Sequence, residues 1–220
     1  MKIVEDEHYT FCEYKQNVDK KRLECPLEKV GFQPLISSLL ERILINTGIQ
    51  VIAVSDNRKN GTQNHDPSGY MGDRGAPDLL LARNFTYYNK NKSQSSNVCD
   101  VEQIAVVEIK VPYKQYNIEQ IKSHLTKVKK VIFTNLVKWV FFEDNENPTK
   151  TIDLQIGRIY KSTWSRNPAE HPIIWKSSIE TPDDFLLNEL GLPLNNIEAE
   201  PVEWEELLTF IKEFVFEKQL

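Results

Sequence analysis

The chain has 220 residues, with 27 Lys and Arg against 32 Asp and Glu, a net charge of −5, 40% hydrophobic residues, 8 Gly and 11 Pro. This ordinary globular composition excludes a disordered tail, a collagen-like repeat and a disulfide scaffold. The three cysteines lack the spacing of a zinc site. The apolar runs are much shorter than the roughly 20 residues of a membrane helix, and the first residues lack the apolar segment of a secretion signal. The sequence therefore predicts a cytoplasmic protein of one domain with an extension.

The first half of the chain predicts one helix followed by three strands. Apolar residues recur at helical spacing over residues 34–46, and Asn46-Thr47-Gly48 supplies a stop signal. Short β-branched or apolar runs predict strands over residues 49–54, 78–82 and 104–111. We expect the second and third of these strands to pair as an antiparallel hairpin. Long polar stretches over 56–75 and 84–100 predict irregular loops, whereas residues 1–30 suggest no role.

The second half of the chain predicts further helices and strands. The predicted helices cover residues 118–128, 183–190 and 202–216, and the predicted strands cover residues 131–134, 138–142 and 151–160. The connection before residue 131 is long enough for a right-handed crossover, which would make the strands at 104–111 and 131–134 parallel. The apolar stripe of the last helix predicts that it packs on the core or on a partner.

These elements together predict an α/β fold with a mixed central β-sheet flanked by helices and a helical C-terminal appendix. We expect an N-terminal extension over residues 1–32, a core over 33–160 and an acidic helical extension over 161–220. The charges support this division, because residues 180–220 hold eleven acids and two lysines. In contrast, residues 110–138 hold seven lysines and one acid. Either segment alone is typical of a solvated face, but together they indicate a basic working surface in the middle of the chain.

Glu108 and Lys110 form the pattern with the clearest chemical meaning. They lie two apart in a predicted strand, so both side chains point to the same face. Burying a carboxylate is costly unless it is paired or binds a metal, and Asp78, placed by Pro77 at the start of the neighbouring strand, is the natural partner. Two adjacent carboxylates repel each other, and a divalent cation removes that repulsion. Their oxygen donors favour Mg²⁺, with Mn²⁺ as a substitute.

Pro77-Asp78 followed by Glu108-Ile109-Lys110, on successive strands, resembles the PD-(D/E)XK nuclease superfamily and its restriction-endonuclease-like fold. The resemblance covers roughly residues 33–142. It implies that Asp78, Glu108 and the main-chain carbonyl of Ile109 bind Mg²⁺, and that Lys110 assists the attacking water. The implied activity is Mg²⁺-dependent hydrolysis of nucleic acid, most naturally double-stranded DNA. The chain would be an endonuclease of a restriction or defence system, or the nuclease domain of a larger enzyme, with a homodimer or further subunits as open partners.

The resemblance also suggests supporting residues on two helices. Many members add an acid from the helix before the first strand, and Glu41 is the candidate, although its place opposite the centre of the apolar stripe suits solvent equally well. Gln120 and His124 share one face of the helix after Lys110, where many relatives carry a Gln and an aromatic residue that support the site. Because His replaces the aromatic residue, solvation or packing of His124 stays an alternative.

Other basic and polar residues are candidates for contact with nucleic acid. We expect the Lys-rich segment to contact phosphates, because neutralising them releases counterions. Its most prominent members are Lys127, Lys129 and Lys130. The polar stretch before Asp78 adds His65, Asp66, Asp73 and Arg74, for which an ordinary surface loop is the equal alternative.

Two alternative interpretations remain open. The Glu-x-Lys pattern is common, and a second copy, Glu13-Tyr14-Lys15, has no acid-bearing strand before it. Lys110 could therefore form a buried structural ion pair with Glu108 or Asp78. The whole chain would then be a non-catalytic interaction protein on a nuclease-like fold, with its acidic C-terminal region as a docking surface.

Overall fold

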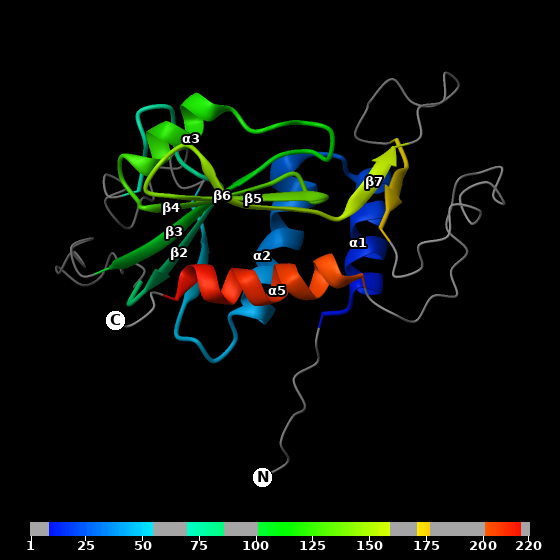
Figure 1. Cartoon of the computed structure of the whole chain (residues 1–220), viewed down its shortest axis with the longest axis horizontal. Helices are drawn as coiled ribbons and strands as arrows, with labels where there is room; N and C mark the ends of the chain where they lie inside the picture. The colour runs from blue at the N-terminus through cyan, green and yellow to red at the C-terminus, as the bar shows by residue number, and fades with distance from the viewer. Residues whose placement is uncertain (1–8, 55–69, 86–100, 159–170, 177–200, 217–220) are drawn as a thin grey trace, which may run out of the picture.

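A mixed six-stranded β-sheet lies at the centre of the computed structural model, in the strand order β1-β2-β3-β4-β5-β6 (Figure 1). The structure describes residues 9–54, 70–85, 101–158, 171–176 and 201–216. Within the sheet, β3 and β4 are parallel and the other neighbouring strands are antiparallel. The strands are β1 (Gln50–Ala53), β2 (Leu79–Arg83), β3 (Glu102–Ile109), β4 (Lys130–Thr134), β5 (Lys138–Glu143) and β6 (Pro148–Asp153). A separate antiparallel pair consists of β7 (Gln155–Arg158) and β8 (Ile173–Trp175).

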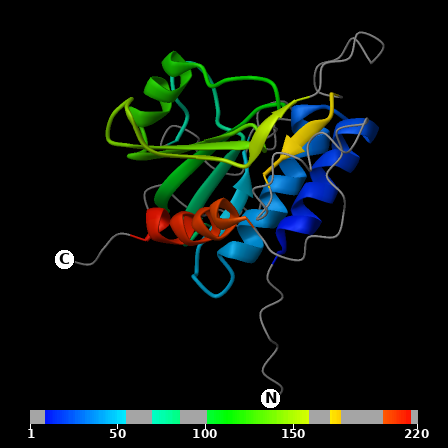
Figure 2. The ribbon, with the colours of Figure 1, turned by 45° about the vertical axis from the view of Figure 1, so that its right-hand side comes forward.

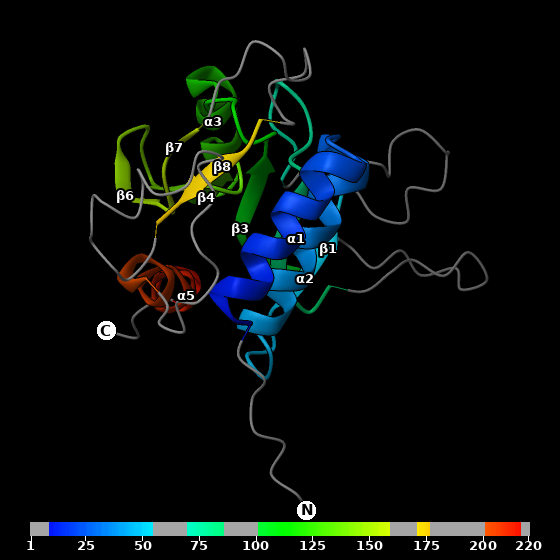
Figure 3. The same cartoon turned by 90° about the vertical axis from the view of Figure 1, so that its right-hand side faces the viewer.

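Helices cover both faces of this sheet. They are α1 (Phe11–Glu24), the π-helical turn η1 (Glu28–Phe32), α2 (Gln33–Ile43), α3 (Ile118–Leu125) and α5 (Val202–Val215). In Figure 1, α3 lies on one side of the sheet and α5 on the other, and α1 and α2 lie side by side in Figures 2 and 3. The result is a three-layer arrangement with the sheet in the middle.

The alternation of strand residues assigns each side chain to one of these faces. Leu79 and Val107 belong to the larger hydrophobic core, which contains the buried residues of α1, α2 and α5. Leu80 and Val106 belong to the smaller core, which includes Ile121 of α3. Glu108 follows the same alternation, so its side chain lies on the face that α3 covers. The strand therefore brings Glu108 directly to the helix that carries Gln120 and His124.

Helix α1 is an integral part of the larger core, although the sequence suggested no role for it. Its N-terminus is a capping box, in which the Glu13 backbone N–H donates to Thr10 Oγ1 at 3.2 Å and the Thr10 N–H donates to Glu13 Oε2 at 3.0 Å. Tyr14 is fully buried and its hydroxyl donates to the Leu136 carbonyl at 2.6 Å. The second Glu-x-Lys copy thus lies on a helix, where Glu13 has a structural role.

The α/β class, the mixed sheet flanked by helices and the C-terminal helix are confirmed. The antiparallel pairing of β2 with β3 and the parallel pairing of β3 with β4 are also as predicted. The domain boundaries at residues 32/33 and 160/161 stay a prediction, while the buried residues of α1 and α5 share one core with the sheet. The predicted helix at 183–190, most of the two long polar loops, and His65 and Asp66 lie outside the described residues. In the described part of the chain, helices long and apolar enough to cross a membrane are absent.

Candidate functional site

Asp78 is held at the end of β3 by the pairing of two strands. The Asp78 N–H donates to the Val107 carbonyl at 3.0 Å, and Asp78 Oδ2 accepts the Ile109 N–H at 2.8 Å. Behind it, Gln33 Nε2 donates to the Asp78 carbonyl at 3.1 Å. These bonds fix both the backbone and the carboxylate of a residue that is only 8% exposed. Strand pairing therefore places Asp78 beside the Glu108-Ile109-Lys110 segment, as the sequence predicted.

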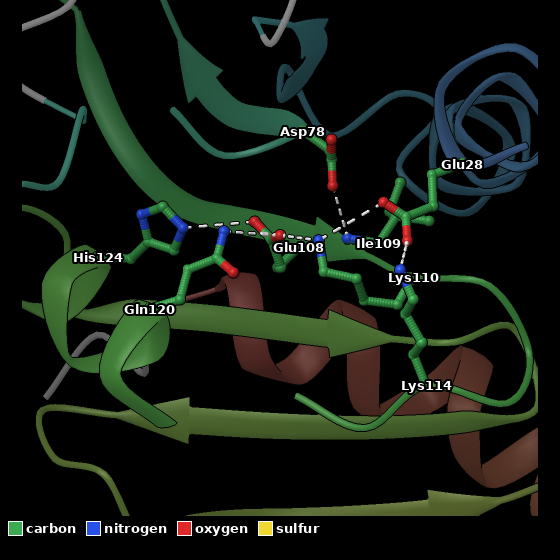
Figure 4. Close-up of polar contacts among 8 residues, drawn as sticks. All are labelled: Glu28, Asp78, Glu108, Ile109, Lys110, Lys114, Gln120 and His124. Atoms are coloured by element: carbon green, nitrogen blue, oxygen red, sulfur yellow. Dashed lines mark hydrogen bonds and ion pairs between the residues drawn. The ribbon is translucent and has the colours of Figure 1, made fainter. Parts of the chain in front are cut away.

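Glu108 is 3% exposed, and both of its carboxylate oxygens face other side chains (Figure 4). Lys110 Nζ and Gln120 Nε2 both donate to Oε1, the second at 2.8 Å. His124 Nε2 lies 3.4 Å from Oε2, and the His124 side chain is fully buried. Gln120 and His124 share one face of the helix after Lys110, as predicted, and that face meets Glu108. His124 is thus packed against the site, with its Nδ1 lacking a hydrogen-bond partner among the described residues.

Glu28, on the π-helical turn η1, also lies at the site, although its sequence pattern did not indicate this. Glu28 Oε2 lies 3.7 Å from Lys110 Nζ, and Glu28 Oε1 accepts from Lys114 Nζ at 3.3 Å (Figure 4). Lys110 therefore lies between two carboxylates, one from β3 and one from η1. The turn depends on Gly31, because a Cβ there would lie 1.9 Å from the Cys25 carbonyl oxygen. In the sequence, the only signal for this turn is weak: Gly31 stands just before the predicted apolar helix and three residues after Glu28.

Burial and neighbouring charges shift the pKa values of this group in different directions. Burial, followed by repulsion from Glu108, raises the pKa of Asp78 to about 6. Burial also opposes ionisation of Glu108, but the contacts with His124 and Lys110 outweigh it and lower the pKa of Glu108 below its usual value. Burial disfavours the Lys110 ammonium, yet Glu108, Glu28 and Asp78 raise its pKa above the usual value. The site therefore contains a charged lysine, a glutamate whose ionisation its partners favour and an aspartate whose ionisation burial and Glu108 disfavour.

The donor set fits a hard divalent cation. Within the described ranges, a cluster of three or more His, Cys, Asp and Glu side chains placed to hold a metal is absent. Magnesium, however, is commonly held by one or two carboxylates together with waters and substrate phosphates. Asp78 and Glu108 are two such carboxylates, and a cation between them would offset both the burial and the repulsion from Glu108 that raise the pKa of Asp78.

The other predicted residues lie elsewhere or have protein partners. Glu41 is exposed and accepts from Ser37 Oγ at 3.3 Å, so the structure does not bring it to this group. Arg74 pairs with Glu119 at 3.6 Å, beside α3. Lys127 and Lys129 are exposed, as a phosphate-contacting surface requires, whereas Lys130 is buried and pairs with Glu143 at 3.5 Å. Lys130 is thus a poor choice for a contact with nucleic acid, because strand alternation turns it inward.

Comparisons with known proteins give a partial structural likeness. The chain matches no protein-family model and no curated protein. Among solved structures, it is similar to part of a chain in the cryo-electron microscopy structure of a DrdV–DNA complex, with a TM-score of 0.40 and 13% sequence identity. The similarity covers 64% of this chain and 12% of that one. The chain thus corresponds to a small part of the length of that protein.

The raised pKa of Asp78 predicts a pH-dependent stability. Because the folded pKa of about 6 exceeds the ordinary 3.8, the stability that protonated Asp78 contributes is complete below about pH 4 and is lost as the pH rises through 6. We therefore expect Asp78→Asn, in EDTA, to raise the Tm at pH 8 and to change it little at pH 3.5, below both pKa values. The gain is about 3 kcal/mol at most. Thermal melts at both pH values measure it, and an equal loss of stability at both would contradict it.

Proposed function

We propose that this protein is a Mg²⁺-dependent nuclease that hydrolyses phosphodiester bonds in double-stranded DNA. The observation that supports it best is the meeting of Asp78, Glu108 and Lys110 at the paired ends of β2 and β3. This is the arrangement that the Pro77-Asp78 and Glu108-Ile109-Lys110 motifs imply through their resemblance to the PD-(D/E)XK superfamily. A role in a restriction or defence system, or as the nuclease domain of a larger enzyme, belongs to the same proposal.

Asp78, Glu108 and the main-chain carbonyl of Ile109 would hold the ion. When bound, Mg²⁺ would polarise the phosphate and lower the pKa of a bound water. Buried carboxylates suit this task, because they are kept in place by hydrogen bonds to the backbone and to α3. Gln120 and His124 would act as positioning residues for Glu108, since each contacts one of its carboxylate oxygens.

Lys110 would act as a charged hydrogen-bond donor. Its raised pKa keeps the ammonium form at neutral pH, so Lys110 is suited to orient the attacking water and to stabilise negative charge on the phosphate. Accepting a proton from the water would need the neutral amine, which the surrounding carboxylates disfavour. Among the roles that the resemblance allows for this lysine, the geometry supports orientation and charge stabilisation best.

A non-catalytic interaction protein is the second candidate. The specific observation in its favour is the ion pair between Glu108 and Lys110. Because of this pair, the buried Glu108 carboxylate has a charged partner even without a metal. Such a protein would need neither a metal nor a nucleic acid at Asp78 and Glu108. The two candidates therefore differ in a directly measurable property.

Incubating the full chain with linear duplex, supercoiled and single-stranded DNA, and with RNA, tests the proposal. We expect cleavage of duplex DNA with Mg²⁺ or Mn²⁺ and none with EDTA, because the metal would supply both the polarised phosphate and the activated water. Gel electrophoresis of the products measures it. Absence of cleavage with either metal, together with no Mn²⁺ binding by calorimetry, would favour the interaction protein.

A further inference from the structure

Lys110 and Lys114 share the carboxylate of Glu28. The three side chains come from the end of β3, the following loop and the turn η1, and Figure 4 shows both ammonium groups directed at Glu28. Lys114 is 50% exposed at its side chain, whereas Lys110 is mostly covered. Lys114 therefore presents its ammonium group at the exposed side of the site. Lys110 also pairs with Glu108, so the more available of the two charges is that of Lys114.

Two hydrogen bonds fix the backbone of Lys114 in the loop after β3. The Lys114 carbonyl accepts from Asn135 Nδ2 at 2.7 Å, and the Lys114 N–H donates to the Val111 carbonyl at 3.0 Å. Asn135 is 2% exposed, and its Oδ1 accepts from the Lys138 N–H at 2.9 Å. The loop after β3 is thereby tied to the turn between β4 and β5. This order reduces the entropy that Lys114 would lose on binding a ligand.

We propose that Glu28 is a positioning residue that aligns Lys110 and Lys114 as a two-lysine phosphate-binding site. Lys114 binds a phosphate of the DNA next to the one that Lys110 faces. An ammonium group has three donors, so Lys114 can keep its bond to Glu28 and still donate to phosphate oxygens. This inference rests on the proposed function for its substrate, but its binding step needs no cleavage.

The position of Glu28 supports a role beyond the pairing of two charges. Glu28 begins a π-helical turn, a rare element that often occurs at functional sites. The turn is closed by backbone bonds from Gly31 and Phe32 to the Leu27 carbonyl, at 2.9 and 3.2 Å. The Glu28–Lys114 pair is half exposed at its lysine, and an ion pair near the surface contributes little to stability, so this pair alone does not account for the turn. It does place one carboxylate within reach of both lysines.

Binding of a fluorescent DNA duplex in EDTA tests the role of Lys114 without cleavage. We expect Lys114→Ala to weaken binding several-fold and to reduce the slope of log affinity against log salt by about 0.9, the value for one phosphate contact. The matched control is Lys150→Ala, because Lys150 is also a half-exposed lysine paired with an acid, Glu206, but lies on the far edge strand β6. If Lys114→Ala behaves as Lys150→Ala does, the two-lysine site is wrong.

Glu28→Gln tests the positioning role. If the Glu28 carboxylate only reduced the positive charge of the two lysines, Glu28→Gln would remove that effect. DNA would then bind more tightly and be cleaved at the native rate. We expect instead that affinity in EDTA does not increase and that kcat with Mg²⁺ falls about tenfold, while Glu206→Gln changes neither. Tighter binding with native kcat would overturn the positioning role. If the unaltered chain does not cleave DNA at all, the proposed function fails, and the binding measurements in EDTA still decide whether Lys114 contacts phosphate.

Discussion

Asp78→Asn and Glu108→Gln are each expected to slow Mg²⁺-dependent DNA cleavage by at least about a hundredfold. A bound metal contributes several kcal/mol to such a reaction, and about 1.4 kcal/mol corresponds to a factor of ten in rate. The amide oxygen that Asp78→Asn introduces can still accept the Ile109 N–H, so the first variant should keep its fold. Single-turnover cleavage of a DNA duplex measures the rate, and calorimetric titration with Mn²⁺ measures the loss of metal binding.

Lys110→Ala separates the lysine from the metal ligands. It removes no carboxylate, so metal binding should persist while cleavage is lost. Glu13→Gln and Lys15→Ala are the controls, because the second Glu-x-Lys copy lies on α1, and both variants should cleave at nearly the native rate. Native cleavage by Lys110→Ala, or metal binding by Asp78→Asn equal to that of the unaltered chain, would contradict the nuclease proposal.

Local pattern and strand pairing made much of the sheet predictable. Helical spacing predicted residues 34–46, and the observed α2 covers Gln33–Ile43. The hairpin of β2 with β3 follows from two apolar runs joined by one excursion, and it brings Asp78 to Ile109. The long crossover after β3 correctly predicted the parallel partner β4. The meeting of Asp78 with the Glu108-Ile109-Lys110 segment was predictable because Asp78 stands at the start of the strand that pairs with β3.

What the sequence did not reveal depends on contacts between distant segments. Helix α1 has charged residues on most of its surface, and its buried side chains are recognisable mainly from their partners; the Thr10 and Glu13 capping box was the available signal. Glu28 meets Lys114 across 86 positions, which no local spacing encodes. Glu41 was chosen because it lies on the helix before β1, but the helix turns it to solvent. The periodicity of α2 predicts which of its residues face the core. The acid that reaches the site is instead Glu28, on the turn η1 before that helix.

Trp204→Ala is expected to lower the free energy of unfolding by about 3–5 kcal/mol, the usual cost of truncating a buried tryptophan. Trp204 on α5 is fully buried in the larger core. Its ring centroid lies 4.9 Å from that of Tyr14 and 5.6 Å from that of Phe11, both on α1. Its Nε1 donates to the Tyr9 carbonyl at 3.2 Å, so the truncation also leaves a buried acceptor without a partner. Since domains are typically stable by about 5–15 kcal/mol, this loss is a large fraction of the total.

Val202→Ala on the same helix is the matched control, because Val202 is 72% exposed and its truncation should change stability by less than about 0.5 kcal/mol. Trp204→Phe should fall between the two, since it keeps most of the ring packing but loses the bond to Tyr9. Urea unfolding followed by circular dichroism measures all three variants. If Trp204→Ala were as stable as Val202→Ala, α5 would not be part of the core. If the loss is as large as expected, α5 and α1 stabilise each other. A deletion of residues 180–220, made to isolate the candidate site, would then unfold the rest of the chain.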